Sequence, residues 1–96
     1  MPEITVVAKI VARPDSVEDL KAELLKLVVP TRREQGCLKY DLHQDRQDPS
    51  LFIFYETWES AECLEKHINS EHYQAYAGAV VGMIREKTVH TMTRIA

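Results

Sequence analysis

The sequence has little of what marks a membrane, secreted or nucleic-acid-binding protein. Its 96 residues include two cysteines, three glycines and one tryptophan, and 12 basic residues are outnumbered by 15 acidic ones. The formal net charge of −3 offers no basic surface, so we expect no nucleic-acid partner. No apolar run approaches the roughly 20 residues of a transmembrane helix, and the N-terminal MPEITVV lacks the basic region and cleavage site of a signal peptide. We therefore expect a cytoplasmic protein with no membrane partner.

The two cysteines give no sign of a disulfide or a metal site. Cys37 and Cys63 do not form a CxxC pair; one falls at an expected strand start and the other in an expected helix. Small numbers of cysteines in a reducing compartment are usually structural. We expect two buried or half-buried thiols.

The composition is that of one folded domain spanning residues 1–96. Hydrophobic residues make up 45% and charged residues 28% of the chain, which argues against disorder. A chain of this length can build only a limited core. We find no linker, no low-complexity segment and no usable internal repeat.

Alternation of apolar and polar residues predicts four β-strands. They are expected at residues 4–13, 37–44, 51–58 and 86–95.

Apolar residues at helical spacing predict a helix that follows Ser16, the expected N-cap. Pro30 is expected to break or restart this helix, and residues 31–35 to add a short polar turn that Gly36 ends. Ser60 and Ser70 predict the starts of two more helices.

The resulting order, β-α-β-β-α-β, predicts an α+β fold of the ferredoxin-like, split type. We expect a four-stranded antiparallel sheet with its helices on one face. The first and third strands carry apolar residues on both faces, so the uncovered face would expose an apolar surface. The economical solution is a homodimer that packs open sheet face against open sheet face, and a monomer is the alternative.

The third strand places an acid on an otherwise apolar face. Glu56 lies between Phe54 and Trp58 on the face that we assign to the helices. In a pocket, Trp58 could form a flat wall for a planar substrate, and burial beside aromatic rings would raise the pKa of Glu56 toward that of a general base. The alternative is a structural carboxylate paired with a cation of a neighbouring strand. The candidate cations are Lys9, Lys39 and Arg94.

The segments PTRREQGCLKYDLHQD and FIFYETWESAECLEKHINSEHYQAYA resemble the antibiotic biosynthesis monooxygenase family, particularly its small quinol-monooxygenase-like members. The resemblance covers the chain through the order and spacing of its motifs. It implies a dimeric α+β barrel in which each subunit has a pocket between sheet and helices. It also implies oxygenation of phenols, quinols or anthrones without metal, flavin or haem, with dioxygen as co-substrate.

The family also contains haem-degrading enzymes and an isomerase of a phosphorylated quorum-sensing sugar, so membership alone does not define a reaction. Haem-degrading relatives use an asparagine in the first strand and a histidine in the last helix. The matching positions here are Lys9 and Tyr76. This departure argues against haem degradation.

Two histidines are candidate acid–base groups. His67 shares a helix face with apolar residues, and relatives carry a histidine there, so a pocket role and a core role are equally open. His72 is the stronger candidate, because a helix N-terminus disfavours the imidazolium and keeps a neutral base available. A metal site is not expected, since the two histidines are five residues apart with no acid at ligand spacing.

Other residues are expected to line the pocket. Tyr73 and Tyr76 are candidates, with core packing as the alternative. Asp41 corresponds to an acid linked to the pocket in similar family members, although a salt-bridged surface position fits equally well. Residues 32–34 are expected to be a solvated helix end.

The chemistry that we expect is proton abstraction from a phenolic or enolic substrate, followed by direct reaction of the anion with dioxygen. Two alternatives stay open at this point. One is an isomerase of a small hydroxy-carbonyl compound that uses the same pocket and base. The other is a non-catalytic dimeric ligand-binding protein.

Overall fold

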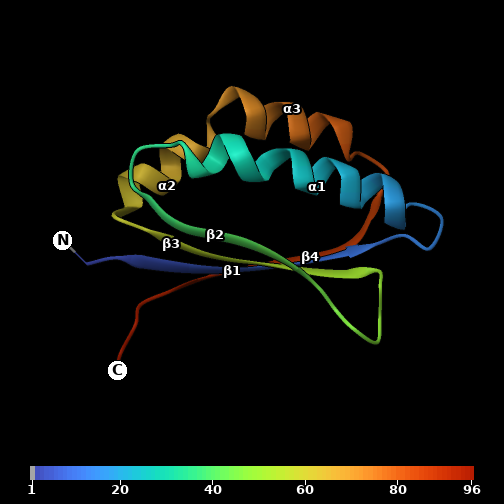
Figure 1. Cartoon of the computed structure of the whole chain (residues 1–96), viewed down its shortest axis with the longest axis horizontal. Coiled ribbons are helices and arrows are strands. Elements are labelled where there is room, and N and C mark those ends of the chain that lie inside the picture. The colour runs from blue at the N-terminus through green and yellow to red at the C-terminus, as the bar shows by residue number, and fades with distance from the viewer. Residues whose placement is uncertain (1) are drawn as a thin grey trace.

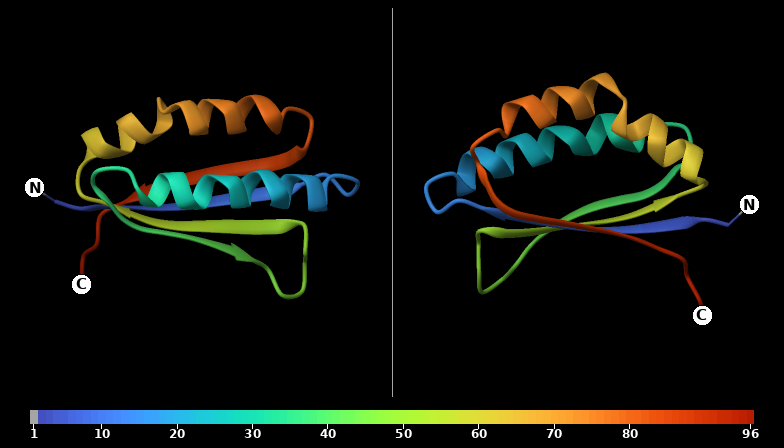
Figure 2. Two further views of the ribbon diagram at one scale, coloured as in Figure 1. Left: turned by 45° about the horizontal axis from the view of Figure 1, so that its top comes forward. Right: turned by 180° about the vertical axis from the view of Figure 1, so that it is seen from behind.

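The computed structural model describes residues 2–96, which form a four-stranded sheet with three helices on one face (Figure 1). The chain order is β1 (Ile4–Ala12), α1 (Val17–Arg32), β2 (Cys37–Gln44), β3 (Leu51–Trp58), α2 (Ala61–Ile68), α3 (Glu71–Ala79) and β4 (Ile84–Met92). Helices α1 and α3 lie side by side, and the turned views show no helix on the opposite face of the sheet (Figure 2). The expected α+β, ferredoxin-like architecture is confirmed, with the second helical connection divided between α2 and α3.

The strand order is β2-β3-β1-β4, and all neighbouring strands are antiparallel. Strands β1 and β2 run in the same direction without pairing, because β3 lies between them. Glu56 pairs with Val6 of β1 on one side and with Tyr40 of β2 on the other. Its side chain therefore projects from the middle of the sheet into the layer below the helices.

Alternate residues of β3 build the centre of the core. Phe52, Phe54 and Trp58 are buried in one core cluster with Leu20 and Leu24 of α1, which are fully buried. Burying each such side chain contributes roughly 1.5–3 kcal/mol. This face of the sheet is thus strongly specified, since a shift of one residue would turn the whole set toward solvent.

Helix α1 differs from expectation at both ends. Pro30 does not break it; the helix continues to Arg32. Proline removes one backbone donor, and with only two helical residues after Pro30 the disruption is confined to the last turn. At the other end, Ser16 makes no side-chain capping bond, and its hydroxyl instead donates to Asp15.

The turn after α1 depends on a glycine. Gly36 has a φ of +84°, and a Cβ at this position would lie 2.3 Å from Sγ of Cys63. Its carbonyl also accepts a hydrogen bond from the backbone N–H of Glu59 at 2.8 Å. Gly36 therefore allows the turn that carries Glu34 to pack closely against the start of α2. Cys37 and Cys63 are both free and half-buried, as expected, and burial first and Glu34 second raise the pKa of Cys37 to about 11.

The outer face of the sheet is open in this single chain. Tyr55 and Met92 point to that side and are exposed, and Val7 lies between their strands. Strand β4 is also exposed on its helix-facing side, where Val89 keeps 50% of its surface accessible. None of the helices among the described residues is long and apolar enough to cross a membrane.

Candidate active site

Two histidines enter the layer between helices and sheet where α2 meets α3. His67 lies in the last turn of α2, and His72 is the second residue of α3. Ser70 caps α3 by accepting a bond from the backbone N–H of Tyr73, and its hydroxyl donates to the carbonyl of His67 at 2.6 Å. This one serine holds the two short helices, and so the two imidazoles, in a fixed relation.

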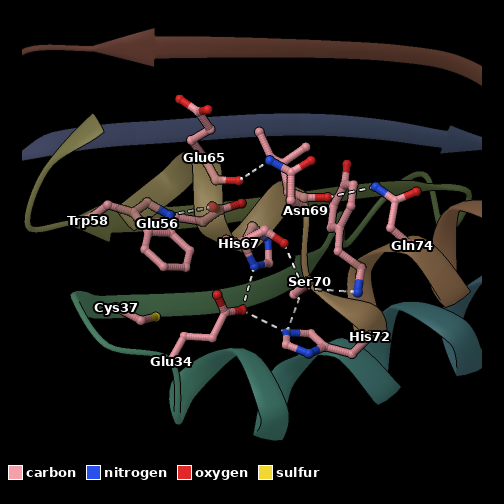
Figure 3. Close-up of polar contacts among 12 residues, drawn as sticks. Glu34, Cys37, Glu56, Trp58, Glu65, His67, Asn69, Ser70, His72 and Gln74 are labelled. Carbon is pink, nitrogen blue, oxygen red and sulfur yellow. Dashed lines mark hydrogen bonds and ion pairs between the residues drawn. The ribbon is translucent and has the colours of Figure 1, made fainter. Parts of the chain in front are cut away.

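Glu34 joins the two imidazoles through one oxygen (Figure 3). Its Oε2 atom lies 2.7 Å from Nδ1 of His67 and 2.7 Å from Nε2 of His72. The carboxylate comes from the turn after α1, and its side chain is only 15% exposed. The expectation that Glu34 belongs to a solvated helix end was therefore wrong.

The contacts of Glu34 define which imidazole nitrogens carry protons. An ionised carboxylate only accepts hydrogen bonds, so Nδ1 of His67 and Nε2 of His72 must both donate to it. The proton on His72 is also shared with Oγ of Ser70, 3.3 Å away. A neutral His67 in this tautomer keeps a free lone pair on Nε2, as a general base requires.

His67 is enclosed by aromatic rings. Its ring centroid lies 4.8 Å from that of Trp58, 5.1 Å from that of Tyr73 and 5.5 Å from that of Tyr40. The residue is 2% exposed. Burial lowers its pKa below the ordinary value, although the bond to Glu34 acts in the opposite direction. The imidazole is therefore neutral near pH 7.

Glu56 is buried without a cation. Its Oε1 accepts a hydrogen bond from the indole N–H of Trp58 at 2.8 Å, and the residue is 5% exposed. Burial raises its pKa to about 7, with the Trp58 bond opposing this shift and Glu34 adding to it. The alternative, an ion pair between Glu56 and a cation of a neighbouring strand, was therefore wrong. The expected cations contact other groups: Lys9 binds Glu86, Lys39 binds Asp41, and Arg94 binds the carbonyl of Ala96.

A cavity of about 60 Å³ lies between the sheet and α2–α3, and both His67 and Glu56 line it. A space of this size has room for a few water-sized groups. The remaining walls are mostly apolar or aromatic. They include Phe54, Tyr73 and Tyr76, which were expected in the pocket, together with Val6, Ala8, Ile10, Leu27, Tyr40, Leu64, Ile68, Lys87 and Val89.

Three expected site residues lie elsewhere. Trp58 is fully buried behind the lining, so it holds Glu56 and His67 in place instead of forming a wall. His72 lines a separate hollow between α1 and α3, and Glu34 links it to His67 of the pocket. Asp41 points to the open sheet face and pairs with Arg32 and Lys39, as its surface alternative expected.

Sequence reasoning missed Glu34 and Lys87 as site residues. Glu34 is separated from His67 by 33 positions, and only the packing of α2 against the turn at Gly36 brings the two together. Lys87 lies on the same face of β4 as Val89, and that alternation could have marked it as facing the pocket.

Glu34, His67 and His72 could also hold a divalent cation. Their ligand atoms all lie within 4.8 Å of one another, and two imidazoles with one carboxylate form a common ligand set. The sequence argument against a metal rested on the lack of a nearby acid. The fold supplies that acid from another element.

This is a small, largely apolar pocket with a neutral histidine held by a carboxylate and a second carboxyl group of raised pKa. Such an arrangement suits proton transfer to or from a bound aromatic or enolic compound. Residues 3–79 match the family model of the antibiotic biosynthesis monooxygenases, and the chain belongs to that family.

Two curated proteins and one solved structure are similar over most of the chain. The chain is 36% identical over 77 residues to "Putative monooxygenase Rv0793" of Mycobacterium tuberculosis, which covers 80% of this chain and 75% of that protein. It is 28% identical over 99 residues to "Probable quinol monooxygenase YgiN" of Escherichia coli K12, covering 93% of this chain and 95% of the relative. The crystal structure of PA3566 from Pseudomonas aeruginosa superposes with a TM-score of 0.96 at 38% identity, covering 100% of this chain and 97% of that one.

Proposed function

We propose that this protein is a cofactor-independent monooxygenase that acts on a small aromatic or quinol-type substrate. The single observation that carries the proposal is the pair formed by Glu34 and His67. It leaves a neutral imidazole with a free nitrogen in a pocket whose walls are mostly apolar and aromatic.

In the first step, Nε2 of His67 takes the proton of a phenolic or enolic hydroxyl. Glu34 stabilises the imidazolium that forms, because its carboxylate already accepts the Nδ1 proton. Glu56, with a pKa raised to about 7, holds a proton near the same cavity and can return it. The apolar walls keep water away from the anion.

The anion then reacts with dioxygen. Transfer of electrons to O₂ forms a carbon–oxygen bond, and protonation gives a hydroperoxide. For an anthrone-type carbon, loss of water leaves a carbonyl group, so one oxygen atom enters the product and the other leaves as water. The substrate supplies all four electrons, and the step requires no external reductant.

The comparisons support this substrate class through the names of two relatives, one a monooxygenase and one a quinol monooxygenase. The absence of a cofactor is part of the proposal. Oε2 of Glu34 already accepts hydrogen bonds from Nδ1 of His67 and Nε2 of His72, so these three facing atoms satisfy one another without a cation. The homodimer through the open sheet face and the cytoplasmic location stay predictions.

The test is oxygen uptake with menadiol and with anthrone, by protein dialysed against a chelator and checked for residual metal. We expect uptake above the autoxidation background for the parent. We expect His67→Gln to lower the rate of oxygen uptake by about 100-fold or more, the usual contribution of a general base. His43→Gln, on the exposed side of β2, is the matched control. Isomerisation without oxygen uptake would favour the isomerase alternative, and loss of activity on chelation would contradict the cofactor-free proposal.

A further inference from the structure

The end of the pocket beside β4 carries hydrogen-bond donors that proton abstraction does not use. Lys87 faces inward from β4, opposite Ile10, and lines the cavity. Its ammonium lies 3.3 Å from the hydroxyl of Tyr73 and 6.0 Å from the centre of that ring. Among the described residues it is the one cationic side chain that lines this cavity.

Lys87 has no carboxylate within ion-pair distance in residues 2–96, whereas Lys9, Lys26 and Lys39 are each paired with an acid. Glu86 on the same strand points to the opposite face and binds Lys9. Lys87 is itself exposed to solvent, and among the described residues its partners are the hydroxyl and the ring of Tyr73.

Tyr76 supplies a second, independent observation. It is 6% exposed and lines the cavity, and its hydroxyl is buried without a hydrogen-bond partner in the part of the chain described. An unpaired buried hydroxyl costs free energy, and one in a cavity wall can be satisfied by a bound group that accepts its proton. Burial raises the pKa of Tyr76, so the hydroxyl keeps its proton and can donate it.

We infer that Lys87, Tyr73 and Tyr76 form a subsite for the carboxylate of an aromatic substrate. All three residues line both the main cavity and the adjoining hollow beside α3, so they stand at the boundary between the two. A single cation with two hydroxyls suits a monoanion. A phosphate dianion would be poorly compensated here, because the opposite end of the cavity already holds Glu56.

The geometry also orients the substrate. Tyr73 contacts His67, with ring centres 5.1 Å apart, and its hydroxyl contacts Lys87. Tyr73 therefore connects the base to the anion subsite, and a substrate that binds both would lie alongside this ring. An aromatic ring with a hydroxyl group para to a carboxylate carries its two polar groups at opposite ends, as this arrangement requires.

The experiment is calorimetric titration of the protein with 4-hydroxybenzoate and with its uncharged isostere 4-hydroxybenzamide. We expect the acid to bind at least about tenfold more tightly than the amide, since a hydrogen bond to a charged group contributes more than one between neutral groups. Lys87→Gln should remove that preference, and Tyr76→Phe should weaken binding of the acid severalfold. Lys66→Gln, an exposed lysine of α2 outside this cavity, should leave the preference unchanged.

Equal affinity for acid and amide, no binding of either, or full preference in Lys87→Gln would each overturn the inference. Phenyl phosphate forms a third arm, and tighter binding of phosphate than of carboxylate would also contradict it. The inference rests on the proposed function only in assuming an aromatic ligand. The calorimetric titration does not involve the reaction with oxygen. If it fails, the carboxylate subsite is wrong, and oxygen uptake by the parent still tests the monooxygenase proposal separately.

Discussion

Glu34 and His67 are 33 positions apart in the chain, yet Oε2 of Glu34 lies 2.7 Å from Nδ1 of His67. This contact determines which nitrogen of the imidazole is free. It joins the turn after α1 to the end of α2. The account of proton abstraction depends on it.

Replacing Glu34 tests that contact directly. Glu34→Gln keeps the size of the side chain but removes the charge that orients His67 and stabilises its imidazolium form. We expect the kcat for oxygen uptake to fall by about 10- to 100-fold, a part of the general-base contribution, with little change in KM. The control is Glu62→Gln, in the exposed first turn of α2. Unchanged kcat in Glu34→Gln would show that the carboxylate does not assist His67.

The raised pKa of Glu56 predicts a dependence of stability on pH. Its carboxyl ionises near pH 4.5 when unfolded and near pH 7 when folded. The unfolded state therefore loses its proton first, and stability falls as pH rises from 4.5 to 7. The loss should be at most about 3 kcal/mol.

Urea unfolding at pH 5 and pH 8 measures this effect. Glu56→Gln keeps an acceptor for Trp58 and cannot ionise, so it should gain stability relative to the parent at pH 8 but not at pH 5. The lowered pKa of buried His67 makes stability rise with pH, opposite to the effect of Glu56. Because His67 is present in both proteins, the difference between parent and variant isolates Glu56. Parallel changes in the two proteins would mean that Glu56 is not the group that titrates.

The strands and their buried faces were predictable from sequence because alternation is local. The alternating residues Phe52, Phe54 and Trp58 indicate the buried face of β3 within a few positions of the chain. The second and third strands match their predicted bounds, and β4 begins and ends earlier than expected, at Ile84 and Met92. Its alternation continues beyond the last paired residue, which is why the pattern alone overestimated its end.

The site was only partly predictable, because its central contact is not local. The sequence indicated Glu56 and His67 through their polar character on apolar faces. It ranked His72 above His67 from the helix N-terminus, whereas the packing places His67 in the cavity and His72 behind Glu34. No periodicity relates the turn at Glu34 to α2, so that contact needed the three-dimensional structure.

The close approach at Gly36 gives a prediction for stability. Gly36 and Gly82 have nearly equal φ values, +84° and +83°, but only at Gly36 would a Cβ meet other atoms. Gly82→Ala should lose about 1–2 kcal/mol from backbone strain. Gly36→Ala should lose about 1–3 kcal/mol more, because the methyl group overlaps Cys63. Chemical denaturation of both variants measures the difference, and equal losses would show that the contact with Cys63 relaxes at no cost.

The open sheet face predicts a dimer, and a single charged substitution on that face should dissociate it. Tyr55 is exposed at the centre of that face, and Leu25 is similarly exposed on α1 at the opposite surface. We expect sedimentation analysis to give a dimer for the parent and for Leu25→Lys. Tyr55→Lys should give a monomer, because the lysine would be buried without a partner. A monomeric parent, or a dimer that tolerates Tyr55→Lys, would contradict packing through this face.

The most direct test of the central claim is the pH dependence of oxygen uptake by metal-free protein, with Glu56→Gln in parallel. With His67 as the base, the rate should rise on the acid side with a midpoint below pH 6.5, because burial lowers the pKa of His67. Glu56→Gln should keep this midpoint, even if its maximal rate is lower. A midpoint near pH 7 in the parent that disappears in Glu56→Gln would instead identify Glu56 as the base, and uptake no faster than autoxidation at every pH would contradict the account as a whole.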